Sequence, residues 1–258
     1  IYLHHHSYAY IDKSSVVFKF LLFLSGTETY HVLLSKKMEI DIKDKYKTVK
    51  KTLVVSNAAF IKKNQPKNSN FVLKDNIKIG FLSNISFDKG IKDFIETLKI
   101  LNNSSVNFSG IIAGRFQDIY SKKFLEKETS KLETVNYIGS INDEDKESFF
   151  KSIDLLLFPT KYRNEAQPLV IFEALSFGVP VIAYDRGCIS ETIKKESGML
   201  IDKSDDFARK ASEIIKKLYK DNKIFKETSS RSFDIFSDAN ETGSMQLRNL
   251  SRFMTNNN

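Results

Sequence analysis

The sequence predicts an α/β protein whose main part is a doubly wound parallel sheet with helices on both faces. The arrangement of apolar segments along the chain predicts this class. From residue 77 to residue 219, short apolar segments alternate with segments of helical periodicity. Such alternation is typical of βαβ units, in which crossover helices cover the parallel strands.

The elements of this part follow one another at regular intervals. Strands are expected at residues 77–83, 106–114, 135–139, 154–158, 179–184 and 198–201. Helices are expected from Gly90 to about residue 101, then through residue 131, and at residues 143–153, 168–177, 190–195 and 205–219. The first helix places Ile91, Phe94, Ile95 and Leu98 on one face, as a helix packed on a sheet requires.

Residues 1–56 show the same kinds of element over a shorter length. Strands are expected at residues 1–3, 30–34 (YHVLL) and 52–55 (TLVV). Residues 36–46 are expected to be helical, because Met38, Ile42 and Tyr46 recur at four-residue spacing. Ile1 is expected to belong to the first strand already, so the sequence is expected to start in the middle of a fold.

Residues 14–24 (SSVVFKFLLFL) are apolar almost throughout, and Lys19 is their only charge. Two interpretations are open. The segment is either a helix buried in the protein or a helix that lies on a membrane surface. Lysines 43, 45, 47, 50 and 51 lie nearby in the sequence and equally fit an ordinary solvated face.

Changes in composition predict the domain boundaries. Residues 57–76 are polar and contain Pro66 and several Asn, so they are predicted to link the N-terminal part, residues 1–56, to the main domain, residues 77–222. The tail, residues 223–258, is mostly polar and is predicted to be helical in part, with frayed ends.

The composition describes a globular protein with a sizeable core, since 41% of the 258 residues are hydrophobic and 28% are charged. The single cysteine, Cys188, excludes a disulfide framework and a cysteine-based zinc site. A formal charge of +8 favours anionic partners: nucleotide diphosphates, anionic membrane surfaces or nucleic acid. Nucleic acid is not predicted, because no basic face is interleaved with aromatic residues.

Two glutamates, Glu165 and Glu173, flank Pro168 eight positions apart. Pro168 suits the first position of a helix, and Gly178 suits the position just past its end. Glu173 is the only charge in that helix, PLVIFEALSF. Either it is a core acid paired with a lysine elsewhere, or it binds a sugar diol beside a phosphate at the helix N-terminus.

Other candidate ligands follow the predicted strands, whose carboxyl ends form the binding edge of a doubly wound sheet. Lys89 precedes a helix, and Gly90 leaves room for a phosphate there. Gly114 and Arg115 follow the next strand. Neither GxxxxGK[ST] nor GxGxxG is present, which argues against ATPase and nicotinamide-binding classes.

The adjacent His4, His5 and His6 are the remaining candidates. Successive side chains of a strand face opposite ways, so the three cannot easily ligate one ion. No metal site is predicted. One of the three could act as a polar or basic group over a substrate.

Residues 164–193, NEAQPLVIFEALSFGVPVIAYDRGCISETI, resemble the signature of retaining, nucleotide-sugar-dependent glycosyltransferases of the GT-B fold, family 4 or "glycosyl transferases group 1". The resemblance extends over residues 77–218, and more weakly to LHHHSYAYI and SNAAFI in the N-terminal part. It implies one complete Rossmann-like domain plus a partial N-terminal one, since only some 55 residues precede the linker. Strands lacking from that part should leave apolar surface exposed.

The resemblance also implies roles for individual residues. Glu173 would bind the nucleotide ribose and Glu165 would face the donor sugar. Backbone N–H groups of Gln167 and Leu169 would meet sugar or phosphate oxygens, and Lys89 would neutralise the diphosphate without a metal or cofactor. One departure is Asn84, which stands where the family has an arginine; Arg115 or Arg163 would then have to compensate.

The implied activity is sugar transfer, with retention, from a nucleotide-diphosphate sugar to a hydroxyl of a saccharide or lipid-linked acceptor. The resemblance implies a role in surface polysaccharide or glycolipid synthesis. It also implies a location in the cytoplasm, peripherally at the inner face of the membrane. A non-catalytic nucleotide-sugar-binding module is the alternative, favoured by Asn84 and the short N-terminal part. A GT-B epimerase is a third hypothesis.

Overall fold

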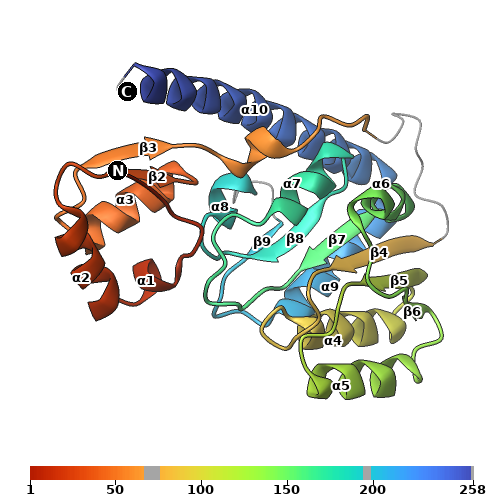
Figure 1. Ribbon diagram of the computed structural model, residues 1–258. Helices are drawn as coiled ribbons and strands as arrows, with labels where there is room; N and C mark the ends of the chain where they lie inside the picture. Colours follow the sequence, from red (N-terminus) through yellow and green to blue (C-terminus); the bar gives the residue numbers. More distant parts are fainter. Residues whose placement is uncertain (67–75, 194–198, 257–258) are drawn as a thin grey trace.

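The computed structural model describes residues 1–66, 76–193 and 199–256, and within them two parallel sheets form the framework (Figure 1). The larger sheet has the order β6-β5-β4-β7-β8-β9. Its strands are β4 (Ile77–Leu82), β5 (Phe108–Ala113), β6 (Val135–Tyr137), β7 (Leu155–Phe158), β8 (Val181–Tyr184) and β9 (Leu200–Ile201). This order confirms the doubly wound prediction. The chain adds β5 and β6 on one side of β4, and then β7, β8 and β9 on the other side, so the winding reverses between β4 and β7.

Helices cover both faces of this sheet. They are α4 (Ile91–Asn102), α5 (Ile119–Thr129), α6 (Asp143–Ser152), α7 (Leu169–Ser176), α8 (Ile189–Thr192) and α9 (Phe207–Lys220). On one face α4 packs against α5 and α9, and on the other α7 packs against the C-terminal helix (Figure 1). Phe81, Phe94, Phe150, Phe172 and Phe207 are fully buried between the layers. Such a core supplies most of the stabilisation, about 2 kcal/mol for each fully buried aromatic side chain.

The smaller sheet has the order β1-β2-β3, with β1 (Tyr2–His4), β2 (Tyr30–Leu33) and β3 (Lys51–Val54) all parallel. Helix α3 (Lys36–Lys45) begins at Ser35, whose side chain accepts a hydrogen bond from the Met38 N–H. Met38 and Ile42 are fully buried, which confirms the predicted apolar face. The short α1 (Ala9–Asp12) was not predicted from sequence.

Helix α2 (Val16–Ser25) contradicts one of the two interpretations of its segment. Val16 is 82% exposed and Phe23 is 81% exposed, and Leu22 is its only fully buried residue. Only Leu22 and the half-buried Phe18 reach the cluster around α1 and α3. Within the described part of the chain the buried-helix interpretation is therefore contradicted, because no described element lies over the other side of α2.

The tail is a single long helix, α10 (Asn222–Thr255), whereas only part of the tail was predicted to be helical. At about 1.5 Å per residue it is long enough to run from the main domain to the smaller sheet, as Figure 1 shows. There Phe253 contacts Tyr30 at a ring-centroid distance of 4.9 Å, and Leu250 packs on Val32 and Val55. The helix thereby holds the two sheets together.

The predicted linker begins with a 3-10 helix, η1 (Asn57–Phe60), which packs on α10 through a hydrogen bond from Asn240 Nδ2 to the Ala58 carbonyl (2.7 Å). Residues 67–75 of the linker, 194–198 after α8 and 257–258 at the C-terminus lie outside the described residues. In the described ranges, no helix combines the length and apolarity needed to cross a membrane.

Candidate functional site

The loops that leave β4 and β7 meet at the point where the winding of the large sheet reverses. Lys89 Nζ lies 2.6 Å from Glu165 Oε2, and Thr160 Oγ1 donates a hydrogen bond to the same oxygen (3.1 Å). The Lys89 ammonium also lies 4.4 Å from the centre of the Tyr162 ring. Only 16% of the Lys89 side chain and 11% of the Glu165 side chain are exposed. The structure thus brings together two residues that are 76 positions apart in sequence.

Helix α7 starts beside this pair. Pro168 has φ −68° and ψ 127°, so it is the N-cap and the helix begins at Leu169, one residue later than predicted. Gly178, with φ +68°, follows the helix as expected. The backbone N–H groups of Gln167 and Leu169 have no hydrogen-bond partner among the described residues, which leaves them free to donate to an anion.

Glu173 lies one turn further along α7 and is paired. Its Oε1 is 2.9 Å from Lys146 Nζ on α6, and Lys146 also contacts Asp143. Burial lowers the pKa of Lys146, but its bonds to Asp143 and Glu173 outweigh this and hold that pKa above the ordinary value. A lysine partner on another element is what the core-acid interpretation expected. Glu173 Oε2 has no partner in the described part of the chain, so the diol interpretation also stays open.

Two glycines bring the loops close together. Gly90 has φ +85°, and a Cβ there would stand 2.0 Å from the Pro159 carbonyl oxygen. Gly114 has φ +138°, and a Cβ there would stand 1.8 Å from the Ser83 oxygen. The predicted reason for Gly90 was access for a phosphate. The structure supplies another reason, since the backbone of the β7 loop occupies the space of its side chain.

The other predicted ligands make no contact with the Lys89–Glu165 pair among the interactions described above. Asn84, Arg115 and Arg163 are exposed. Gln167 Oε1 accepts hydrogen bonds from the Asn57 N–H (2.7 Å) and the Ser56 hydroxyl (3.3 Å), which ties α7 to the smaller sheet. The Gln167 side chain therefore joins the two parts of the chain.

The three adjacent histidines differ in burial, and only His4 belongs to strand β1. His5 is buried, and its ring nitrogens bond Tyr10 Oη (2.7 Å) and His31 Nδ1 (2.9 Å). Burial, together with the nearby imidazoles of His31, His4 and His6, lowers the pKa of His5 to about 3. His4 and His6 are exposed. Across residues 1–66, 76–193 and 199–256, no group of three His, Cys, Asp or Glu side chains could hold a metal ion.

A family profile described as "Glycosyl transferases group 1" matches residues 61–231. The chain belongs to the glycosyl transferases group 1 family. This match covers well over half of the chain, including β4 to β9 and both glutamates. The signature assigned from residues 164–193 is therefore confirmed at the level of the family.

This glycosyl transferases group 1 chain is similar to several curated proteins. An uncharacterized 41.2 kDa protein in the cps region of Klebsiella pneumoniae is 30% identical over 174 residues, which are 67% of this chain and 45% of that protein. CapM of Staphylococcus aureus, a capsular polysaccharide biosynthesis glycosyltransferase, is 28% identical over 155 residues, which are 59% of this chain and 39% of CapM. The matched region thus spans less than half the length of these relatives.

Solved structures place this group 1 chain in the GT-B fold. HepE of Anabaena, in complex with UDP, superposes with a TM-score of 0.77 at 17% identity, covering 97% of this chain and 71% of HepE. The superposition includes the smaller sheet as well as the large one. At that identity it shows the fold alone.

Three residues of this candidate site were not predicted from the sequence: Thr160, Tyr162 and Lys146. Thr160 and Tyr162 contact Glu165 and Lys89, and their position directly after an apolar strand was a usable signal. Lys146 pairs with Glu173 from α6, a helix whose charges give no sign of which one points inward.

Proposed function

We propose that this protein transfers a sugar from a nucleotide-diphosphate sugar to an acceptor hydroxyl, with retention at the anomeric carbon and without a metal. The observation that carries the proposal is the Lys89–Glu165 pair at the start of α7. It sets a cation, a carboxylate and unpartnered N–H groups at the carboxyl edge of a doubly wound sheet, the usual ligand site of that fold. The similarity to CapM, a capsular polysaccharide biosynthesis glycosyltransferase, supports a role in surface polysaccharide synthesis.

Charge around the leaving group drives the proposed chemistry. As the bond to the sugar breaks, negative charge develops on the β-phosphate. Lys89 and the N-terminus of α7, with its Gln167 and Leu169 N–H groups, stabilise that charge from a preformed position. Because these groups are fixed by the fold, little reorganisation is needed when the bond breaks.

Glu165 suits a hydrogen-bonding role toward the donor sugar. Lys89 and Thr160 both bind its Oε2, so the carboxylate is held in one orientation. An acceptor hydroxyl that attacks from the face of the leaving group gives retention. Proton nuclear magnetic resonance of the first product formed would show the anomeric configuration directly.

Glu173→Ala tests the nucleoside end of the site. We expect at least tenfold weaker binding of whichever of UDP, GDP and ADP stabilises the wild type most, because the ribose diol loses its acceptor. Calorimetry with the ribose and 2′-deoxyribose forms of that nucleotide is the measurement. The variant should also lose its preference for ribose.

Asp143→Ala is the matched control, since it removes the other carboxylate partner of Lys146 and is 93% exposed. It should bind the nucleotide like the wild type. If Glu173→Ala retains wild-type affinity and ribose preference, Glu173 is a core acid paired with Lys146 and the assignment fails.

A non-catalytic nucleotide-sugar-binding module is the second candidate. Its support is the exposed Asn84 in place of the arginine clamp of the family, and the short match to its relatives. Release of nucleoside diphosphate from UDP-, GDP- and ADP-sugars separates the candidates. If the protein binds a nucleotide sugar but releases no nucleoside diphosphate when an acceptor is supplied, the non-catalytic module is favoured.

We also propose that α2 lies on an anionic membrane. Its exposed apolar residues, among them Phe20 and Phe23, stand on a helix without an acidic residue, and Lys19 adds a positive charge. Phe20→Glu with Phe23→Glu should lower binding to phosphatidylglycerol-containing vesicles at least tenfold in a sedimentation assay. Met245→Glu, a substitution of a half-exposed apolar residue on α10, should leave it unchanged. Equal vesicle binding by all three proteins would contradict the proposal.

A further inference from the structure

Arg186 follows β8 at the carboxyl edge of the large sheet, and its side chain makes two polar contacts within the described residues. Its Nε donates a hydrogen bond to the Tyr162 carbonyl (2.6 Å), and its Nη2 lies 3.4 Å from Asp12 Oδ2. Only 14% of the Arg186 side chain is exposed. Because a guanidinium group is planar and rigid, the two contacts fix their acceptors relative to each other. Arg186 therefore links the loop after β7 to the N-terminal part.

Tyr162 connects Arg186 to Lys89. The centre of the Tyr162 ring lies 4.4 Å from Lys89 Nζ, within the range of a cation–π contact. The Tyr162 carbonyl accepts a second hydrogen bond, from the Glu165 N–H (3.1 Å), and the Tyr162 N–H donates to Thr160 Oγ1 (3.2 Å). Because the backbone is bonded on both sides of the ring, the ring is held in one place against the ammonium group.

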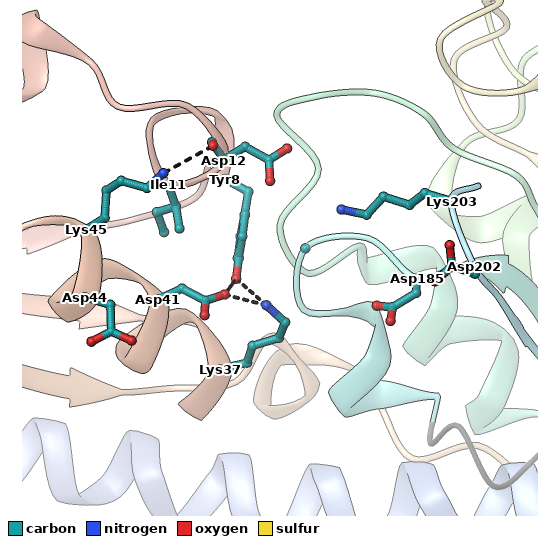
Figure 2. Close-up of a pocket in the computed structure, with 11 residues that line it drawn as sticks. Tyr8, Ile11, Asp12, Lys37, Asp41, Asp44, Lys45, Asp185, Asp202 and Lys203 are labelled. Atoms are coloured by element: carbon teal, nitrogen blue, oxygen red, sulfur yellow. Dashed lines mark hydrogen bonds and ion pairs between the residues drawn. The ribbon is translucent and has the colours of Figure 1, made fainter.

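Asp12 fixes the other end of the guanidinium group. It is the last residue of α1, and Figure 2 shows its carboxylate turned from that helix toward the main domain. Helix α1 is itself bonded to the end of α3. The Tyr46 hydroxyl donates to the Tyr10 carbonyl (2.6 Å), and Lys45 Nζ donates to the Asp12 carbonyl (3.3 Å). A continuous set of contacts thus runs from the N-terminal part to the loop of Tyr162.

We infer that Arg186 is a positioning residue of the transfer reaction, which holds the Tyr162 ring against Lys89 and so sets where the Lys89 ammonium meets the donor diphosphate. The inference rests on the proposed function, which assigns Lys89 to the diphosphate. It adds that the geometry of the donor site depends on a contact with the N-terminal part, through Asp12.

A double-variant cycle on the full chain tests this route. The probe is whichever of UDP, GDP and ADP binds the wild type most tightly in calorimetry, and the corresponding nucleoside is the reference. Arg186→Met and Tyr162→Leu should each weaken diphosphate binding about tenfold and leave nucleoside binding unchanged. Together they should also cost about tenfold, whereas two independent effects would multiply to about hundredfold. Tyr162→Phe, which keeps the ring, should recover most of the affinity that Tyr162→Leu loses.

Asp12→Ala separates positioning from a simple effect of charge. Removing a negative charge alone would strengthen the binding of an anion. Loss of the Asp12 contact should instead weaken diphosphate binding about threefold, because Arg186 is then held at one end only. The Asp12 side chain is 35% exposed, so this variant is expected to fold even if Arg186→Met does not.

Arg209→Met is the matched control, since it removes an exposed arginine that pairs with Glu213 on α9. It should bind the diphosphate like the wild type. Multiplied losses in the double variant, an equal loss of nucleoside affinity, or unchanged or tighter diphosphate binding by Asp12→Ala would overturn the inference. If none of UDP, GDP and ADP binds the wild type, the proposed function itself fails.

Discussion

Replacing Lys89 with methionine is expected to weaken nucleoside diphosphate binding at least hundredfold. Lys89 is the only cation that contacts Glu165 in the described structure, and 16% of its side chain is exposed. Its loss removes the charge-assisted contact to the diphosphate and leaves the Glu165 carboxylate unpaired beside a second anion. A hundredfold loss corresponds to about 2.7 kcal/mol, within the range of about 2 to 5 kcal/mol for removing one partner of a buried, hydrogen-bonded charge pair from a binding site.

Calorimetric titration with the diphosphate and with the corresponding nucleoside makes the prediction specific. The nucleoside should bind both proteins equally, since Lys89 acts on the phosphates. Lys161→Met is the matched control: this lysine lies on the β7 loop, pairs with Asp93 and is 52% exposed. A wild-type diphosphate affinity in Lys89→Met would refute the role of Lys89.

The double variant, Lys89→Met with Glu165→Gln, separates binding from stability. Removing both charges leaves no buried carboxylate without a partner, so urea denaturation should show the double variant to be more stable than Lys89→Met alone. Its diphosphate affinity should stay low. Recovery of affinity along with stability would mean that Lys89 only supports the fold.

The large sheet was predictable because its signals are local. Each strand is a short apolar run followed by helical periodicity, and capping residues mark several helix starts, such as Asn142 before α6 and Asp206 before α9. What the sequence could not show was which face of an apolar helix is covered. Residues 14–24 are apolar all round, so their periodicity could not distinguish the exposed α2 from a buried helix.

The tail shows a second limit. Residues 222–255 read as polar because α10 packs along a narrow face, with residues such as Phe225, Phe236 and Leu250 buried at wide intervals. The structure explains the length of α10, because the helix joins the main domain to the smaller sheet. Contacts of this kind join residues far apart in sequence, as in the hydrogen bond from the Ser56 N–H to Gln246 Oε1, and leave no local pattern.

The candidate site was predictable in its acids and lysine but not in their pairing. Glu165, Glu173 and Lys89 stand out by spacing, by strand ends and by resemblance to the family. The pairs Lys89–Glu165 and Lys146–Glu173 depend on how loops from different strands converge. The roles of individual residues remain predictions, which the substitutions above are designed to test.

Gly90→Ala is expected to cost about 3 to 5 kcal/mol of unfolding free energy, which is the largest stability change predicted for this chain. Two terms add. The alanine must adopt φ +85°, and its Cβ would stand 2.0 Å from the Pro159 carbonyl oxygen, a backbone atom that cannot turn aside. Urea denaturation followed by circular dichroism measures the total.

Gly139→Ala separates the two terms. Gly139 has φ +87°, but a Cβ there meets nothing within 4 Å, so only the conformational strain of about 1 kcal/mol remains. The difference between the variants therefore measures the contact between the Gly90 and Pro159 backbones. That contact fixes Lys89 relative to the loop of Glu165, so Gly90→Ala should also lower the diphosphate affinity, while Gly139→Ala should leave that affinity unchanged. Equal costs for the two substitutions would show that the β4 and β7 loops move apart easily, and that the Lys89–Glu165 pair is not held by the backbone.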